Sequence, residues 1–195
     1  MLSPDFVYVG SVAAFAGDAS YVRDVLRRLT QPNRVSWLMW GIATSLVGIS
    51  QIRQGVGLAC LLSFAIGLGD LGIFGISFVR GNGVWRLGPF DFACGVASCL
   101  GLIVWAATDN NTAALVAFIV ADACATIPTV AKSWSAPQSE SIAPYAATAL
   151  SSLIVLASVR QWTSGAVAFA LWLTCINLVL VVLIATKVGV RTHRR

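Results

Sequence analysis

Charged side chains are scarce in this sequence of 195 residues: Lys, Arg, Asp and Glu together make up 11% of it, whereas 57% is hydrophobic. A soluble domain carries about 25% charged residues. The shortage excludes a disordered chain and a nucleic-acid-binding domain, and a mean hydropathy of +0.82 agrees with that. We therefore expect an integral membrane protein whose main partner is the lipid bilayer.

Histidine and closely paired cysteines are missing where catalysis or metal binding in a membrane would need them. The one histidine is His193, in the C-terminal tail, which excludes a Ser–His pair or a histidine-based metal site inside the membrane. No two cysteines have the CxxC spacing of redox or metal sites. We interpret the five cysteines as small buried hydrophobic residues and expect no enzyme, no cofactor and no metal; they are Cys60, Cys94, Cys99, Cys124 and Cys175.

Seven apolar stretches approach the length of about 20 residues that a transmembrane helix needs. Short connections rich in Pro, Gly, Asn and Gln separate them. The chain is therefore predicted to be an all-α, polytopic membrane protein with seven transmembrane helices. The predicted spans are residues 6–26, 35–51, 56–79, 89–107, 112–131, 141–158 and 163–186.

The net charge of +5 comes from basic residues in the connections, and such a distribution indicates orientation. With the N-terminus outside, only Arg53 and Arg160 fall in outer loops. The pattern predicts a cytoplasmic C-terminus. The eleven inner residues are Arg23, Arg27, Arg28, Arg34, Arg80, Arg86, Lys132, Lys187, Arg191, Arg194 and Arg195.

A weak internal repeat relates the first three spans to the last three. The Asp-Ala pair at Asp18 recurs 104 positions later at Asp122. The order of the matches along the chain supports the repeat more than any single match does. Further matched pairs are Arg28 with Lys132, Thr30 with Ser135, Pro32 with Pro137, Ser36 with Ser141, Trp40 with Tyr145 and Asp70 with Asn177.

Three helices, a linker helix and three further helices form a 3+1+3 plan. Because three is odd, the linker helix gives both triplets the same orientation, and parallel repeats of this kind occur in transporters with a substrate site between the halves. The predicted parts are residues 1–80, the first triple-helix repeat; 81–108, the linker transmembrane helix; 109–187, the second triple-helix repeat; and 188–195, a basic cytoplasmic tail.

The 3+1+3 plan, the basic first loop of each repeat and a proline near the end of the fifth helix make the chain resemble the SWEET and PQ-loop superfamily. The segments that carry the resemblance are residues 21–37 and 121–141, and they look like a bacterial branch of that superfamily. The resemblance implies a small-solute transporter that works by alternating access between the two triplets, and the bacterial branch implies the bacterial inner (plasma) membrane as the location.

The chain departs from that family where a Pro-Gln pair belongs, late in the first helix of each repeat. It has Tyr21-Val22 or Arg23-Asp24 at one of these places and Pro128-Thr129 at the other. Family members use prolines as hinges, so the resemblance implies Pro128 and Pro144 as hinge candidates. Both lie in the second half, which argues against a symmetric pair of hinges.

Four polar residues fall in the middle of predicted spans: Asp18, Asp70, Asp122 and Asn177. An acidic residue there costs about 2.5–3.5 kcal/mol on insertion and normally faces a cavity, a partner or an ion. We predict that they line a midplane site for a small polar solute or a cation, or carry a proton that is coupled to transport. The resemblance implies solute contacts for Asp70 and Asn177. The alternative is structural, with each side chain hydrogen-bonded inside its own triplet.

Tryptophans form a second set of candidate binding residues. Trp37 and Trp40 lie three positions apart, on one face of a helix. The superfamily's nicotinamide riboside transporters pair tryptophans in this way, so the resemblance implies that Trp37, Trp40 and Trp172 stack on a sugar or a heterocycle. The alternative is anchoring at the membrane interface.

Other charged residues have structural interpretations. Asp91, beside Pro89, is expected to cap the start of the fourth span. Arg23 with Asp24 and Lys132 with Glu140 are expected to form ion pairs on the inner surface, where such pairs contribute about 0–1 kcal/mol.

Two kinds of function remain open. The leading hypothesis is a small-solute transporter, and the alternative is a membrane receptor or an assembly or scaffold protein that has the same fold without transport. An aspartyl dyad of Asp18 and Asp122 would be an enzyme site, but their equivalence in the repeat favours a symmetric pathway. A homo-oligomer is possible but not required, because one chain with both triplets already contains one pathway.

Overall fold

The computed structural model describes residues 3, 5–53, 60–79, 84–108, 111–158 and 164–192, and these residues form helices but no strands. The predicted all-α class is confirmed. The helices are α1 (Phe6–Leu26), α2 (Arg34–Arg53), α3 (Cys60–Ile76), α4 (Pro89–Ala107), α5 (Asn111–Ser135), the short 3₁₀ helix η3 (Pro137–Ser139), α6 (Ala143–Ser158), α7 (Ser164–Thr186) and α8 (Val188–Thr192).

The helix bounds follow the apolar stretches of the sequence. α1 and α4 coincide with the predicted ranges 6–26 and 89–107 at both ends. α5 continues to Ser135, beyond the predicted end at residue 131. The predicted start of the third span, at residue 56, lies outside the described residues.

α4 begins where the sequence predicts a cap. The backbone N–H of Gly88 donates to Asp91 Oδ2 over 2.6 Å, and Pro89 occupies the first turn. The capping role of Asp91 is thus confirmed. Its other oxygen accepts a 2.7 Å hydrogen bond from Asn33 Nδ2, which ties the start of α4 to the loop before α2.

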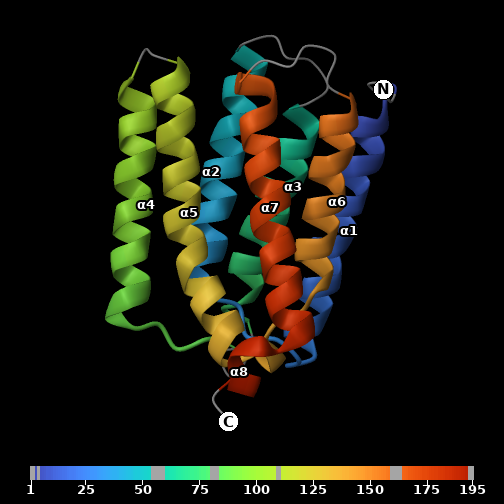
Figure 1. The fold of residues 1–195 in the computed structure, drawn as a ribbon, viewed down its shortest axis with the longest axis vertical. Coiled ribbons are helices and arrows are strands. Elements are labelled where there is room, and N and C mark those ends of the chain that lie inside the picture. The colour runs from blue at the N-terminus through green and yellow to red at the C-terminus, as the bar shows by residue number, and fades with distance from the viewer. Residues whose placement is uncertain are drawn as a thin grey trace.

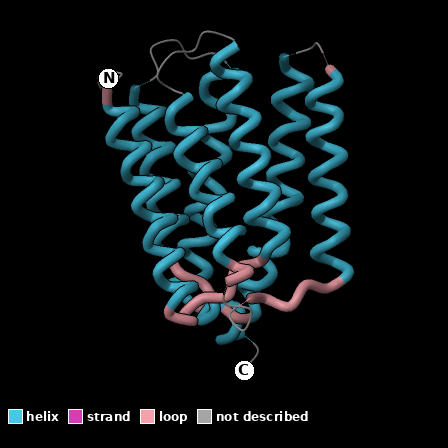
Figure 2. Tube along the Cα trace, turned by 180° about the vertical axis from the view of Figure 1, so that it is seen from behind, coloured by secondary structure: helices cyan, strands magenta, loops and turns pink. Residues whose placement is uncertain are grey.

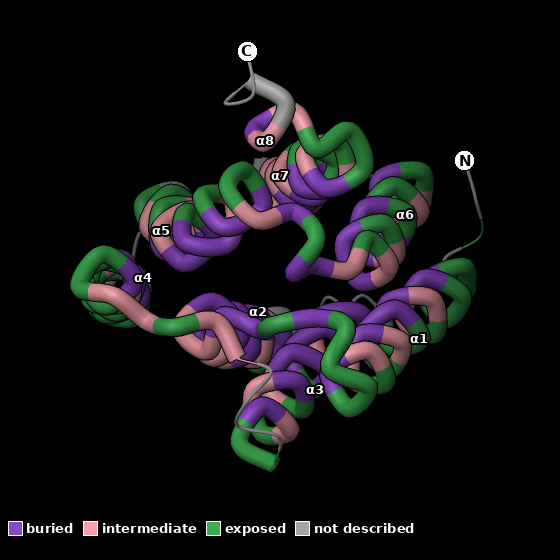
Figure 3. Tube along the Cα trace, turned by 90° about the horizontal axis from the view of Figure 1, so that it is seen from below, coloured by how far each residue is buried: buried purple, intermediate pink, exposed green. Residues whose placement is uncertain are grey.

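The long helices stand side by side (Figure 1) and form two layers of three with one helix outside them (Figure 3). α3 packs between α1 and α2 in one layer, and α7 packs between α5 and α6 in the other. Across the layers, α1 packs against α6 and α2 packs against α5. α4 lies outside and packs against α5 and α2.

One end of the bundle gathers the described basic loops. The connections 27–33, 84–88 and 136–142 lie at this end together with α8, and the N-terminus lies at the opposite end (Figure 2). We call it the basic end, because Arg27, Arg28, Arg86 and Lys187 all lie there.

Several helices have the length and composition of membrane spans. Within the described residues, three segments are long and apolar enough to cross a membrane: Pro89–Ala107, Val116–Ser135 and Val167–Thr186. Shorter apolar helices are Arg34–Ile49, Cys60–Ile76 and Ala143–Ser158.

The outer face of α4 is apolar and exposed. Phe92, Val96, Leu100 and Ile103 form a stripe along it and are each more than half exposed. An apolar surface of this kind is unusual on a soluble monomer and suits contact with lipid. The fold therefore fits a helical membrane protein.

Small and hydroxylated residues join the two layers. Gly17 of α1 lies so close to α6 that an added Cβ would come within 2.5 Å of Ala147. Ser151 of α6 donates to the Gly10 carbonyl over 2.7 Å, and Ser36 of α2 donates to the Ala125 carbonyl of α5 over 2.7 Å. Close approach and polar bonds of this type hold helices together in membranes.

The cysteines are all free. Cys94 is buried, Cys60 and Cys124 are half-buried, and Cys99 and Cys175 are exposed. The prediction of buried hydrophobic residues is therefore wrong for Cys99 and Cys175, because an apolar stretch of sequence does not reveal which face of its helix points outward.

Candidate functional site

A cavity lies between the two layers and is lined by side chains from all six of their helices, whereas α4 contributes none among the described residues. The space between these side chains totals about 450 Å³, counting the part that opens to the exterior. The cavity therefore excludes anything larger than a small molecule.

Six of the seven predicted binding residues line this cavity: Asp18, Trp37, Trp40, Asp70, Asp122 and Asn177. The seventh, Trp172, reaches it indirectly, because its Nε1 donates to Asp122 Oδ2 over 2.6 Å. The structure thus brings together residues that are far apart in the sequence, and their role in binding stays a prediction.

The two predicted hinge prolines occupy different positions. Pro128 lies inside α5 and is not among the lining residues. Pro144 lines the cavity from the second residue of α6, where a helix has no N–H bond to lose. A hinge role for either proline stays a prediction.

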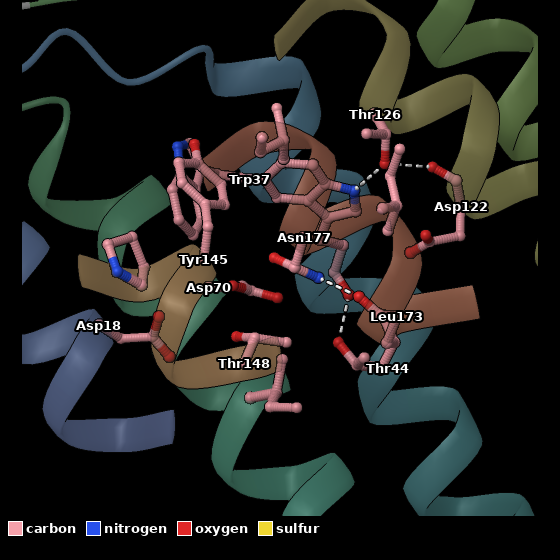
Figure 4. A pocket seen from close by; sticks show the side chains of 15 residues that line it. Asp18, Trp37, Thr44, Asp70, Asp122, Thr126, Tyr145, Thr148, Leu173 and Asn177 are labelled. Carbon is pink, nitrogen blue, oxygen red and sulfur yellow. Dashed lines mark hydrogen bonds between the residues drawn. The ribbon is translucent and has the colours of Figure 1, made fainter. Parts of the chain in front are cut away.

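Asp18 has a buried carboxylate oxygen that no hydrogen bond satisfies. This atom is Oδ2, and the side chain is buried. The carboxylate lies directly against Gly69 of α3, where an added Cβ would overlap Oδ2. Figure 4 shows Asp18 and Asp70 directed toward the same space.

Asp70 lies between the other two acidic residues and interacts electrostatically with both Asp18 and Asp122. The Thr44 hydroxyl donates to the backbone oxygen of Trp40 and also lies beside the Asp70 carboxylate. The described residues contain no group of three acidic, cysteine or histidine side chains close enough to hold a metal ion. The three carboxylates therefore face one space without converging on one point.

Aromatic rings line the side of the cavity toward the basic end. Trp37 packs against Trp40 with ring centroids 5.2 Å apart, and Tyr145 lies 6.3 Å from Trp37 and 6.4 Å from Trp40. Tyr21 continues the cluster at 4.7 Å from Trp37. Trp37 and Trp40 are only 2% and 8% exposed, so they are interior residues rather than anchors at a membrane surface.

A buried ion pair lies beyond the aromatic cluster. Lys132 near the end of α5 pairs with Glu140, and both side chains are fully buried. The prediction of a surface pair is wrong. η3 turns back under the bundle and is held there because the Gln31 N–H donates to the Ser139 carbonyl over 2.9 Å, a contact that sequence spacing does not reveal.

Glu140 joins the ion pair to both layers. Tyr21 of α1 donates to Glu140 Oε2 over 2.9 Å, and Tyr145 of α6 donates to the same atom over 3.2 Å. Lys132 Nζ donates to the Gln31 carbonyl in the loop before α2. The cavity is thus closed toward the basic end by an aromatic cluster and then by an ionic one.

The other predicted ion pair has the expected position. Arg23 and Asp24 form a 3.1 Å pair, and the Arg23 side chain is 56% exposed. This surface pair is confirmed.

Several polar residues that line the cavity were not predicted from the sequence: Thr44, Thr126, Tyr145 and Thr148. Thr44 and Thr126 lie one helical turn after Trp40 and Asp122, so helical spacing from those residues would have found them. Tyr145 has a signal in the repeat itself, where it matches Trp40. Thr148 lies one helical turn after Pro144, but Pro144 was predicted as a hinge and not as a residue of the cavity.

No protein-family model matches the chain, and comparison with curated proteins and with solved structures finds no match. The resemblance to the SWEET and PQ-loop superfamily stays a prediction.

Proposed function

We propose that the protein is a small-solute transporter with seven transmembrane helices, built as two parallel triplets joined by α4, and that it gives its solute alternating access to the central cavity. The observation that carries the proposal is the lining of that cavity. Both layers contribute to it and α4 does not, as expected where a solute site lies between two repeats.

The packing of the helices supports the repeat. In the proposed repeat, α1 corresponds to α5, α2 to α6 and α3 to α7. The contact of α1 with α6 then corresponds to a contact of α5 with α2, and both contacts are present. In both layers, the aspartate of the first helix also contacts the third helix of the same layer. Asp18 lies against Gly69 of α3, and Asp122 accepts a hydrogen bond from Trp172 of α7.

The closed end supports alternating access, because its contacts fall into two groups. Lys132, Glu140 and Tyr145 all belong to the second triplet. The hydrogen bonds that cross to the first triplet at this end run from Tyr21 to Glu140, from Lys132 to the Gln31 carbonyl, from the Gln31 N–H to the Ser139 carbonyl and from Ser141 to Asp24. The triplets can therefore separate at the basic end by exchanging these hydrogen bonds for water, while Lys132 and Glu140 keep each other neutralised.

The test is solute uptake into liposomes that contain the purified protein, with sugars, amino acids, nucleosides and amines as solutes. We expect saturable uptake of at least one class and its loss in Asp70→Asn, which keeps the size of a buried side chain that faces the cavity. Asp5→Asn, at an exposed position near the N-terminus, is the matched control and should transport normally.

Folded protein that moves no solute faster than empty liposomes would contradict the transporter. That result would favour the receptor or scaffold protein. Thermal melting in detergent would show in parallel that both variants remain folded.

A further inference from the structure

The charge of the cavity is one-sided. Asp18, Asp70 and Asp122 line it, and none of the described residues that line it is Lys, Arg or His. Lys132, the buried basic residue at the closed end, is already paired with Glu140. An anionic solute would therefore meet three acidic groups and no compensating base.

The hydrogen-bond donors around the cavity mostly have partners within the protein. Two buried groups of the lining have no hydrogen-bond partner, the acceptor Asp18 Oδ2 and the donor Trp37 Nε1. The groups that remain for a solute are mainly carboxylate oxygens, which accept hydrogen bonds and do not donate them when ionised. The donors with internal partners are Trp40 Nε1 to Thr126, Thr126 to the Asp122 carbonyl, Thr44 to the Trp40 carbonyl, Asn177 Nδ2 to the Leu173 carbonyl, Tyr145 to Glu140 and Trp172 to Asp122.

The spacing of the acidic groups argues against a bare metal ion. The described residues include no cluster of three ligands close enough to hold one, yet Asp70 interacts with both other carboxylates. A cation of several atoms can meet separated carboxylates from within one cavity. The rings of Trp37, Trp40 and Tyr145 line the same space, and aromatic rings of this kind attract cations.

We propose that this cavity binds a small organic cation with N–H groups, a primary ammonium or a guanidinium, with Asp18 and Asp70 as its acceptors. The inference rests on the proposed function in one respect only, because it names the class of solute that would be carried. Binding itself requires no transport.

Methylguanidinium and methylurea test the proposal, because they have nearly the same shape and differ in charge. We expect methylguanidinium to change the tryptophan fluorescence of the purified, full-length protein saturably, and methylurea to bind at least tenfold more weakly. Asp18→Asn should weaken methylguanidinium binding at least tenfold, while Asp5→Asn should leave it unchanged. The comparison of the two ligands on the unmodified protein does not depend on whether Asp18→Asn folds.

Equal binding of methylurea and methylguanidinium, or no binding of either, would overturn the proposal. The liposome assay separates this failure from that of the transporter. Saturable uptake of a neutral solute without methylguanidinium binding would retain the transporter and reject the cation. Methylguanidinium binding without uptake of any solute would retain the cation site and reject the transporter.

Discussion

Asp18 lies where it does because Gly69 has no side chain. The carboxylate fills the place that a Cβ at residue 69 would occupy, and this brings it next to Asp70, the following residue of α3. Two acidic groups from different helices thus share one wall of the cavity. A glycine in the middle of a helix costs about 0.5–1 kcal/mol relative to alanine, and here the missing methyl group makes room for a polar side chain.

Gly69→Ala should destabilise the protein by about 1–3 kcal/mol, the usual cost of inserting a methyl group into a closely packed site. The measurement is unfolding in a detergent titration. Gly72→Ala is the matched control, since nothing lies within 4 Å of a Cβ added there, and it should leave stability unchanged or raise it.

Removing the carboxylate should restore most of the stability that Gly69→Ala loses. The double variant Gly69→Ala with Asp18→Ala measures this coupling. Equal destabilisation by Gly69→Ala and Gly72→Ala would show that the contact with Asp18 has no energetic weight.

Single polar residues of the cavity were the most predictable part of the site. Asp18, Asp70, Asp122 and Asn177 stand out because each interrupts an apolar stretch, and all four line the cavity. Thr44 does not stand out by composition, because threonine is common in apolar helices and often bonds its own backbone, as it does here; only its spacing of one helical turn from Trp40 points to it. Position in the cavity distinguishes such a residue, and composition does not.

At the scale of elements, the connection between α5 and α6 shows where prediction from sequence stops. The apolar stretches predicted α1 and α4 at both ends, because hydrophobic length is a local property. η3 and α8 were not predicted, because contacts with residues distant in the sequence hold these short helices in place. An added Cβ at Gly189 of α8 would overlap the Trp134 carbonyl of α5, so α8 is fixed by the end of α5 rather than by its own sequence.

Lys132→Met should destabilise the protein by about 3–5 kcal/mol, because it leaves Glu140 buried without its counter-charge. Adding Glu140→Gln should recover most of this loss, since a glutamine oxygen still accepts hydrogen bonds from Tyr21 and Tyr145. Detergent unfolding of the single and double variants measures both effects.

The exposed pair supplies the control for that experiment. Arg23→Gln removes the basic partner of Asp24 at a position where the side chain is 56% exposed, and such pairs contribute about 0–1 kcal/mol. Similar losses from Lys132→Met and Arg23→Gln would mean that the buried pair is hydrated in solution.

Pro128 weakens the C-terminal part of α5, because a proline inside a helix has no N–H to donate a hydrogen bond to the carbonyl four residues earlier. The next carbonyl, that of Ala125, accepts a hydrogen bond from Ser36 of α2. A bend of α5 at this point would move Lys132 relative to the first triplet. Of the two hinge candidates, we therefore expect only Pro128 to act as one.

Pro128→Ala should leave the protein folded and slow solute exchange, because a continuous helix bends less readily. Exchange rates in liposomes measure the effect. Pro144→Ala should slow exchange less, since Pro144 lies in the first turn of α6. Slower exchange in Pro144→Ala than in Pro128→Ala would contradict this assignment.

At the scale of the molecule, the two ends of the bundle differ in charge, and this difference predicts orientation. A membrane-impermeant maleimide should label Ser3→Cys in intact cells but label Arg27→Cys only after the cells are opened. Both positions are exposed, and they lie at opposite ends of α1. The experiment uses a background in which the five native cysteines are replaced.

Equal labelling of both positions in intact cells would contradict the predicted orientation. A third position at the basic end, Gln138→Cys in η3, is the control. It should behave like Arg27→Cys, because an even number of proposed spans separates the two.

The buried pair also has a consequence for how the chain is inserted during synthesis. Lys132 and Glu140 are only eight positions apart, so they can neutralise each other as soon as the ribosome has released that segment. Their partners in the other layer, Gln31 and Tyr21, precede them by 101 and 119 positions and are made long before. We therefore expect the segment to enter the membrane with the charges of Lys132 and Glu140 already neutralised by each other, and to find the Gln31 carbonyl and the Tyr21 hydroxyl already in place.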